Sequence, residues 1–190
     1  MKIEDGKGTG YQAEVDGEHK LEVSAVSRTA EHHANHDHGD AYSAIFAVNP
    51  DGANDCIFYL KNNDDLDLII EGVTWQTSGA EEVYYKLNDV GTAVKTNGAD
   101  IVPVNLNAGS GNAANVTCYS NVADGAVDIT GLSGGLTIES LYLTSATSGY
   151  INAEQDIIVP KNKTFSIYCV GGDTLLRGTV MFFFHNHEGI

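Results

Sequence analysis

The chain has 190 residues, with 10 Lys or Arg against 26 Asp or Glu, which gives a formal net charge of −16. Such an acidic chain cannot assemble the basic surface that nucleic-acid binding requires, and an anionic membrane would repel it. A chain of this length buries about 70% of the surface of its unfolded form, so it can form one domain without disulfides. Its 21 glycines favour short strands joined by tight turns over long helices.

The first 40 residues differ in composition from the rest. They begin with the Gly-rich sequence MKIEDGKGTGYQ and contain few large apolar side chains, and their one strand-like piece is Lys20–Val26. The start lacks the apolar stretch of a signal peptide, and no run in the chain is long enough to span a membrane. We therefore predict that residues 1–40 form an extended N-terminal arm and a His-rich linker, and that residues 41–190 form the folded domain.

The His-rich window is EHHANHDHGD, residues 31–40, which holds four of the chain's seven histidines. Either His32 and His36 share a helical face, or His36 and His38 share one side of an extended segment. Adventitious zinc or nickel binding by His32, His36 and His38 is the alternative that this chemistry allows. A specific site also needs supporting groups, which a polar tether lacks. We predict no metal site and no cofactor, and a linker whose histidines gain charge between about pH 7 and pH 5.

From residue 42 onward, short apolar runs alternate with turn sequences such as NPDG and NAGSGN. The absence of a sustained apolar stripe at helical spacing, together with strands recurring every ten to fifteen residues, predicts an all-β fold. We expect an antiparallel β-sandwich of the jelly-roll type, with long loops near residues 89–100 and 121–131. The expected strands are 42–49, 55–62, 66–76, 81–88, 100–107, 115–122, 136–146, 155–159, 164–170 and 177–186.

The last expected strand is apolar on both faces. Val180, Phe182 and Phe184 lie on one face, whereas Met181 and Phe183 lie on the other. A sandwich strand normally turns one face to solvent, so the second face needs a cover. That cover is either another strand, arm or subunit, which makes Met181 and Phe183 a candidate interface, or a loop of the same chain.

The sequence contains no recognisable catalytic arrangement. It lacks a G-x-S-x-G elbow, and the carboxylates of Glu71, Glu139 and Glu154 are scattered. The three cysteines show no CxxC pairing, which predicts buried, reduced thiols. We expect a protein that is not an enzyme. One alternative is a metal-dependent jelly-roll enzyme that uses His185 and His187. Another is a carbohydrate- or receptor-binding domain that uses Trp75 and these tyrosines: Tyr59, Tyr84, Tyr85, Tyr119, Tyr142, Tyr150 and Tyr168.

Both ends of the chain resemble virion structural proteins of tailed bacteriophages. The start has Asp5-Gly6, Gly8 and Gly10, then Ala13-Glu14-Val15-Asp16 and Leu21-Glu22-Val23. The end, DIIVPKNKTFSIYCVGGDTLLRGTVMFFF, is similar to the closing strands of phage sandwich domains. The likeness covers roughly the first 45 and the last 35 residues, and the His-rich window is not part of it.

This resemblance implies a capsid decoration (cement) protein that is made in the host cytoplasm and sits on the capsid surface of the virion. Its expected partners are the major capsid protein and neighbouring copies of itself in a homotrimer, with no nucleic acid and no membrane. The arm would carry the contacts, through Gly6, Gly8, Gly10, Tyr11, Val15, Leu21, Val23 and Val26. The alternative is a receptor- or carbohydrate-binding fibre or adhesin domain of the virion.

Overall fold

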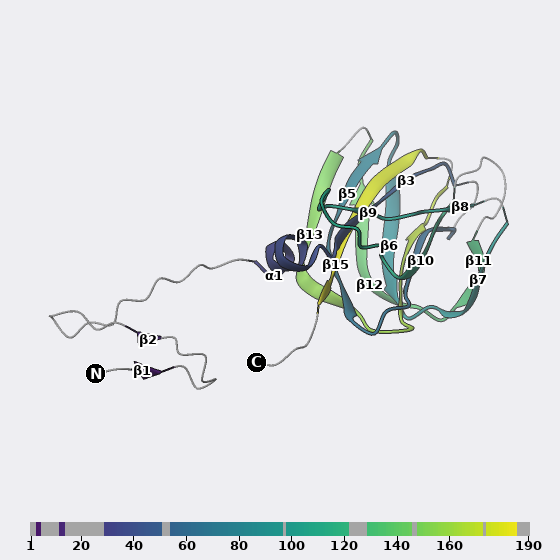
Figure 1. Cartoon of the computed structure of the whole chain (residues 1–190). Helices are drawn as coiled ribbons and strands as arrows, with labels where there is room; N and C mark the ends of the chain where they lie inside the picture. Colours follow the sequence, from purple (N-terminus) through teal and green to yellow (C-terminus); the bar gives the residue numbers. More distant parts are fainter. Residues whose placement is uncertain are drawn as a thin grey trace.

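The computed structural model describes residues 3–4, 12–13, 29–50, 54–96, 98–121, 129–145, 148–172 and 174–185 (Figure 1). Two short helical turns, α1 (Ala30–His33) and the π-helical η1 (Ala34–His38), precede the main strands. The strands are β1 (Ile3–Glu4), β2 (Gln12–Ala13), β3 (Ala41–Val48), β4 (Cys56–Asn62), β5 (Asp67–Thr77), β6 (Glu81–Leu87), β7 (Val90–Lys95), β8 (Ala99–Asp100), β9 (Val104–Asn105), β10 (Val116–Ser120), β11 (Ile129–Ser133), β12 (Leu136–Leu143), β13 (Ser148–Val159), β14 (Thr164–Cys169) and β15 (Leu176–His185).

Two sheets form the body of the molecule. One has the order β12-β6-β14-β4-β10-β8, and the other has the order β13-β5-β15-β3-β9. The pairings within both sheets are antiparallel, and β5 and β15 run side by side over most of their length. Strands that are consecutive along the chain, such as β3, β4 and β5, alternate between the two sheets. The predicted all-β sandwich is therefore confirmed.

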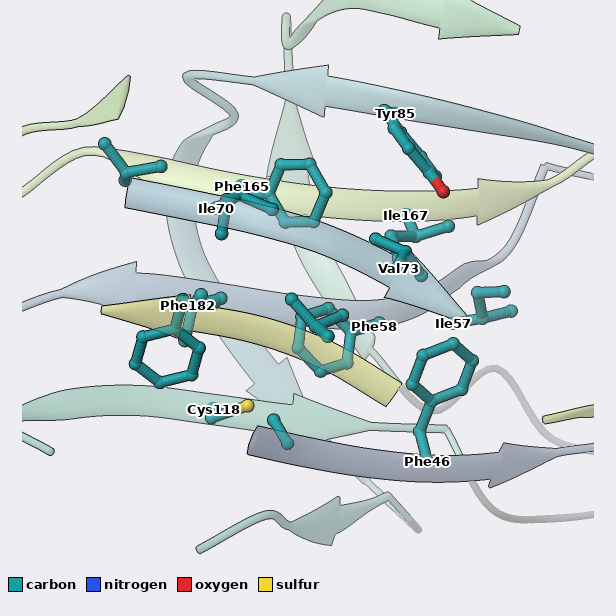
Figure 2. Close-up of a cluster of buried hydrophobic side chains, with 14 of the residues drawn as sticks. Phe46, Ile57, Phe58, Ile70, Val73, Tyr85, Cys118, Phe165, Ile167 and Phe182 are labelled. Atoms are coloured by element: carbon teal, nitrogen blue, oxygen red, sulfur yellow. The ribbon is translucent and has the colours of Figure 1, made fainter. Parts of the chain in front are cut away.

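The core lies between the sheets and follows the alternation of the strands (Figure 2). On β14, Phe165, Ile167 and Cys169 point into it, as the period of two predicts. On β15, Val180, Phe182 and Phe184 do the same. Aromatic rings meet across the layer, with Phe46 of β3 and Phe58 of β4 separated by 5.4 Å between ring centroids. The free cysteines Cys56, Cys118 and Cys169 are buried, as predicted.

Each sheet also has a cover on part of its outer face. Strands β7 and β11 form a two-stranded antiparallel sheet over the six-stranded sheet, where Ile129 packs with Cys56 and Tyr59. The helical turns lie on the five-stranded sheet, where Ala34 packs with Ile69 and Phe183. Apolar side chains on the outward faces of central strands are therefore buried by segments of the same chain.

The predicted strands from residue 42 onward are found, with three differences. Pro103 divides the expected strand 100–107 into β8 and β9, because proline has no N–H to donate to a ladder. The expected strand 155–159 is only the end of the longer β13. The two segments predicted as long loops contribute β7 and β11, which pair with each other across more than thirty intervening residues.

Candidate functional site

One side of the sandwich is open. The edge strands β12 and β13 belong to different sheets (Figure 1). Both strands line the same cavity, whose volume is about 360 Å³. Its walls are mainly apolar, with Ile138 from β12, Ile151 and Ile157 from β13, and Ile70 and Val73 from the strand beneath. A cavity of this size and lining can accommodate a few apolar side chains or a small apolar ligand.

Irregular pairing on both edges produces this opening. The register of β12 against β6 shifts between Thr137 and Glu139, and the register of β13 against β5 shifts between Asn152 and Ile157. Bulges of this kind bend a strand and redirect its side chains. Because the two irregularities face the same cavity, the sheets part there instead of closing over the core.

Two polar groups lie at the cavity. The hydroxyl of Tyr85, which lines it, accepts a hydrogen bond of 2.7 Å from Nε1 of Trp75. Burial raises the pKa of Tyr85, and the nearby charge of Glu139 adds to that effect. The carboxylate of Glu139 itself stands at the exposed rim. Asn152 of β13 is a third polar residue of the lining. The cavity therefore combines apolar walls with a hydroxyl, a carboxylate and an amide side chain, without a convergent set of reactive groups among the described residues.

Exposed apolar side chains flank the opening on both edges. On β12, Leu136 is 68% exposed, Ile138 41% and Tyr142 71%; on β13, Tyr150 is 50% exposed and Ile158 48%. Strand β12 contains no Lys, Arg or Pro, the residues that usually protect an edge from pairing with another chain. The open side thus combines a cavity, two edge strands and exposed apolar side chains, features that are typical of a surface that contacts another protein.

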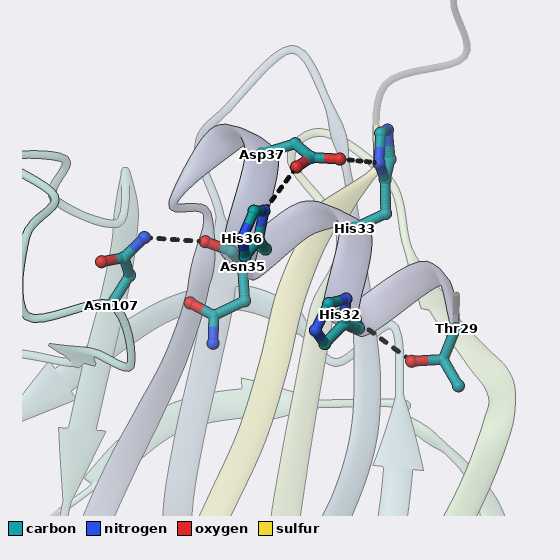
Figure 3. A network of polar contacts seen from close by, with 7 residues as sticks. All are labelled: Thr29, His32, His33, Asn35, His36, Asp37 and Asn107. Atoms are coloured by element: carbon teal, nitrogen blue, oxygen red, sulfur yellow. Dashed lines mark hydrogen bonds and ion pairs between the residues drawn. The ribbon is translucent and has the colours of Figure 1, made fainter. Parts of the chain in front are cut away.

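The His-rich window is a folded element in the described structure. The hydroxyl of Thr29 caps α1 by accepting from the backbone N–H of His32 at 3.2 Å (Figure 3). The carboxylate of Asp37 contacts Nδ1 of both His33 and His36 at 2.6 Å. The expectation of a polar tether is wrong for residues 30–38, because a cap, these contacts and the packing of Ala34 stabilise helical turns.

Asparagines from the loop after β9 hold these helical turns in place. The side-chain amide of Asn107 donates to the carbonyl of Asn35 at 3.0 Å (Figure 3), and that of Asn112 donates to His38 at 2.9 Å. The amide of Asn105 donates to the carbonyl of Gly39 at 2.6 Å. The carbonyls at the end of the turns therefore have partners supplied from outside the element.

The histidines do not converge as ligands in this arrangement. The rings of His32 and His36 stack at 5.5 Å, and His38 lies edge-on to His33 at 5.0 Å. Among the described residues, no group of three His, Cys, Asp or Glu side chains is placed to hold a metal ion. His185 is exposed at the end of β15, and His187 lies outside the described residues.

A second cluster of ionisable groups lies where α1 meets the five-stranded sheet. Burial raises the pKa of Glu71 on β5, and the charge of Glu31 on α1 raises it further. Burial also raises the pKa of Tyr150 on β13, with smaller contributions from Glu71 and Glu31. One carboxylate oxygen of Glu71 is buried without a hydrogen-bond partner among the described residues. The sequence analysis did not predict that the carboxylate of Glu71 lies near that of Glu31, which is 40 positions earlier in the chain.

The predicted aromatic platform is divided among three environments. Trp75 and Tyr85 belong to the core, where their rings stack at 6.3 Å. Tyr59, Tyr119 and Tyr168 pack beneath the β7–β11 pair, and the half-buried Tyr84 lies opposite Tyr168 in the register of β6 and β14. Only Tyr142 and Tyr150 of the set are strongly exposed, and they lie on opposite edges of the open side. A shared sugar-stacking surface built from Trp75 and these tyrosines is therefore not present.

The predicted contact residues have different outcomes. Gly6, Gly8, Gly10, Tyr11, Val15, Leu21, Val23 and Val26 lie outside the described residues. Phe183 is 1% exposed and is covered by the helical turns, and Met181 is half-buried. The cover of Phe183 is thus a segment of the same chain, and it comes from residues 30–38, which were predicted to belong to the arm and linker.

Comparison with protein-family models, curated proteins and solved structures finds no significant match. No helix among the described residues is long and apolar enough to cross a membrane. The functional proposal therefore rests on the geometry of the described residues.

Proposed function

We propose that the chain is a non-enzymatic structural subunit of a virion, a decoration protein that binds the outer capsid surface and stabilises the head. In this proposal three copies assemble through the open sides of their sandwiches, and the N-terminal residues contact the major capsid protein and neighbouring copies. The observation that carries it is the open side, where two unpaired edges and a cavity of about 360 Å³ are left uncovered by the described residues.

The strand order supports a jelly-roll assignment. The eight main strands pair first with last, moving inward along the chain: β3 with β15, β4 with β14, β5 with β13, and β6 with β12. This is the order that results when one long hairpin is rolled into two sheets. Jelly rolls are frequent in capsid and lectin domains, so the order is compatible with a virion protein and with a sugar-binding one.

The open side favours self-association because its edge strands expose apolar side chains and contain no Lys, Arg or Pro. A monomer that kept β12 and β13 bare would expose a row of unpaired backbone groups next to apolar side chains. A net charge of −16 on every copy opposes association at low ionic strength. We therefore expect the assembly to strengthen as salt screens this repulsion.

Sedimentation equilibrium of the full chain tests the self-association. Leu136→Lys places a charge on the β12 edge, and Ile45→Lys is the matched control, because Leu136 is 68% exposed and Ile45 65% exposed. We expect the wild type and Ile45→Lys to form trimers, and Leu136→Lys to weaken association by about tenfold or more. A trimer of unchanged affinity in Leu136→Lys would place the interface elsewhere, and a monomeric wild type would refute self-association.

Capsid binding is tested separately, with heads of the virus whose genome encodes this chain, purified without it. The full chain is expected to co-sediment with these heads and to raise their disruption temperature. A variant that lacks residues 1–26 is expected to keep its thermal unfolding transition and to lose head binding. Undiminished binding by this variant would remove the N-terminal residues from the contact, and a wild type that does not bind heads would refute the decoration function.

A further inference from the structure

A second hollow, distinct in its lining from the cavity at the open side, lies on the outer face of the six-stranded sheet. Its volume is about 220 Å³. Lys61 of β4 and the turn before β14, with Asn162 and Lys163, form one wall, and the turn between β6 and β7, with Asn88 and Asp89, forms the other. Tyr59 also lines the hollow, and its ring stacks on Tyr119 at 6.0 Å.

The two lysines of this hollow differ from the other lysines near this face. Lys86 lies 3.8 Å from the ring centroid of Tyr168, and Lys95 lies 5.1 Å from that of Tyr119. Lys95 also pairs with Asp100, and Lys161 pairs with Asp65. By contrast, neither Lys61 nor Lys163 has an ion-pair partner among the described residues. A chain with only ten basic residues thus places at one hollow two lysines that form no ion pair with a described residue, beside the single carboxylate of Asp89.

The backbone around the hollow is shaped by its own hydrogen bonds. Asn88 and Asn162 both adopt left-handed conformations, with φ of 59° and 63°. The backbone N–H of Asn88 donates to the carbonyl of Thr164 at 3.1 Å, and the backbone N–H of Asn162 donates to the carbonyl of Asn62 at 2.8 Å. Because the backbone holds the turns, the side-chain amides of Asn88 and Asn162 are not needed for the turn geometry, and no hydrogen bond to a described residue engages them.

Asp89 provides a fixed acceptor at the same place. It is 6% exposed, and its carboxylate accepts from the backbone N–H of Gly135 at 3.0 Å, from the hydroxyl of Tyr168 at 3.2 Å and from the hydroxyl of Ser166. A carboxylate has about four lone-pair positions, so these donors leave room for one more. The hollow therefore offers two cations, two amides and one acceptor.

We propose that this hollow binds an anionic sugar residue, with Lys61 and Lys163 at its acid group and with Asn88, Asn162 and Asp89 at its hydroxyls. A bare anion would use the lysines but leave the side-chain amides of Asn88 and Asn162 and the remaining lone pair of Asp89 unengaged. A neutral sugar would give the two ammonium groups no anionic partner. Binding of such a residue goes beyond capsid reinforcement, because it would let the same subunit attach to an acidic glycan on a cell surface.

The test is a titration of the ¹⁵N-labelled full chain with three probes: glucuronate, glucose and inorganic phosphate. With glucuronate we expect saturable shifts of the amide signals of residues 88–91 and 161–164. We expect glucose and phosphate to bind about tenfold more weakly or worse. Equal affinity for glucose would show that the lysines do not recognise the ligand. Equal affinity for phosphate would show a general anion site, and no shift with glucuronate would refute the site altogether.

Variants assign the contacts. Lys61→Gln with Lys163→Gln is expected to abolish the preference for glucuronate over glucose. Lys161→Gln, which removes one charge at the adjacent paired lysine, is expected to retain it, and each single variant, Lys61→Gln or Lys163→Gln, is expected to weaken it. Asn88→Gly and Asn162→Gly keep the left-handed backbone readily accessible and remove the amides, so they should lower glucuronate affinity without lowering phosphate affinity. Retained preference in the double lysine variant would overturn the proposal.

Since these titrations need neither capsids nor trimers, their outcome is independent of the decoration function.

Discussion

Trp75 of β5 donates its indole N–H to the hydroxyl of Tyr85 of β6 at 2.7 Å, and this hydrogen bond joins the two sheets across the core. Both residues are almost completely buried, and their rings are nearly parallel, with an angle of 18° between the planes. The pair therefore satisfies the one polar atom of the only tryptophan while adding apolar area to the core.

Removing the acceptor of this bond is predicted to destabilise the fold. Tyr85→Phe leaves the buried indole N–H without a partner, which costs about 1–3 kcal/mol of unfolding free energy. Denaturant unfolding followed by circular dichroism, which can be read in variants with and without Trp75, measures this cost. In a double-mutant cycle, Trp75→Phe should reduce the cost of Tyr85→Phe, because no orphaned donor remains. Additive costs would mean that the bond contributes nothing.

The carboxylate of Glu71 is predicted to make stability depend on pH. Its pKa is raised in the folded state by burial and by Glu31, so the folded protein binds this proton more tightly than the unfolded chain. The associated stability is present below the unfolded pKa and is lost as pH rises through the folded pKa. Glu71→Gln should therefore match the wild type near pH 4 and exceed its melting temperature at pH 7.

Glu139→Gln is the control for this prediction, because it makes the same charge change at an exposed position of β12. Melting temperatures of both variants between pH 4 and pH 7 give the comparison. A difference between Glu71→Gln and the wild type that stays constant with pH would contradict the assigned ionisation.

Asp89 is predicted to organise the turn between β6 and β7 and its contact with the turn before β12. Asp89→Asn replaces one acceptor oxygen by an amide that can only donate, which opposes the donors of Ser166, Tyr168 and Gly135. We expect a loss of about 1–3 kcal/mol and faster amide exchange at residues 88–91 and 133–135. Unchanged exchange at Gly135 would show that the carboxylate does not hold this turn.

Phe183 is predicted to anchor the helical turns on the five-stranded sheet. Phe183→Ala removes the ring that packs with Ala34 and Ile69, so the protein should lose up to about 3–5 kcal/mol of stability. Amide exchange at residues 34–40 should accelerate more than exchange in β14. Met181→Ala, a half-buried position on the same strand, is the control and should affect these amides far less.

The strands of the core could be read from the sequence because their signal is local. Phe165, Ile167 and Cys169 alternate with Ser166 and Tyr168, and the first three side chains do point into the core. A polar residue such as Ser166 at an alternate position is typical of a face turned to solvent, yet Ser166 is buried. Its cover includes the turn of Asp89, which lies 77 positions away, and no periodicity within β14 reports on such a partner.

The helical turns of residues 30–38, in contrast, could not be predicted from the local sequence. A segment of this length has little helical stability by itself, because nucleation costs more than so few hydrogen bonds return. The cap at Thr29 was present in the sequence, but the packing of Ala34 and the amides of Asn105, Asn107 and Asn112 come from tertiary contacts. For this reason the composition of the window indicated a tether.

The sequence by itself determined the all-β class, the inward faces of the main strands, the buried thiols and the strongly acidic charge, because each depends on composition or on a period of two. Only the tertiary structure decided that Glu31 approaches Glu71, that β12 and β13 leave a cavity between them, and that Lys61 and Lys163 share a hollow with Asp89. These features depend on strand register, bulges and long-range pairing. Such properties arise from contacts between residues far apart in the chain, and no local pattern encodes them.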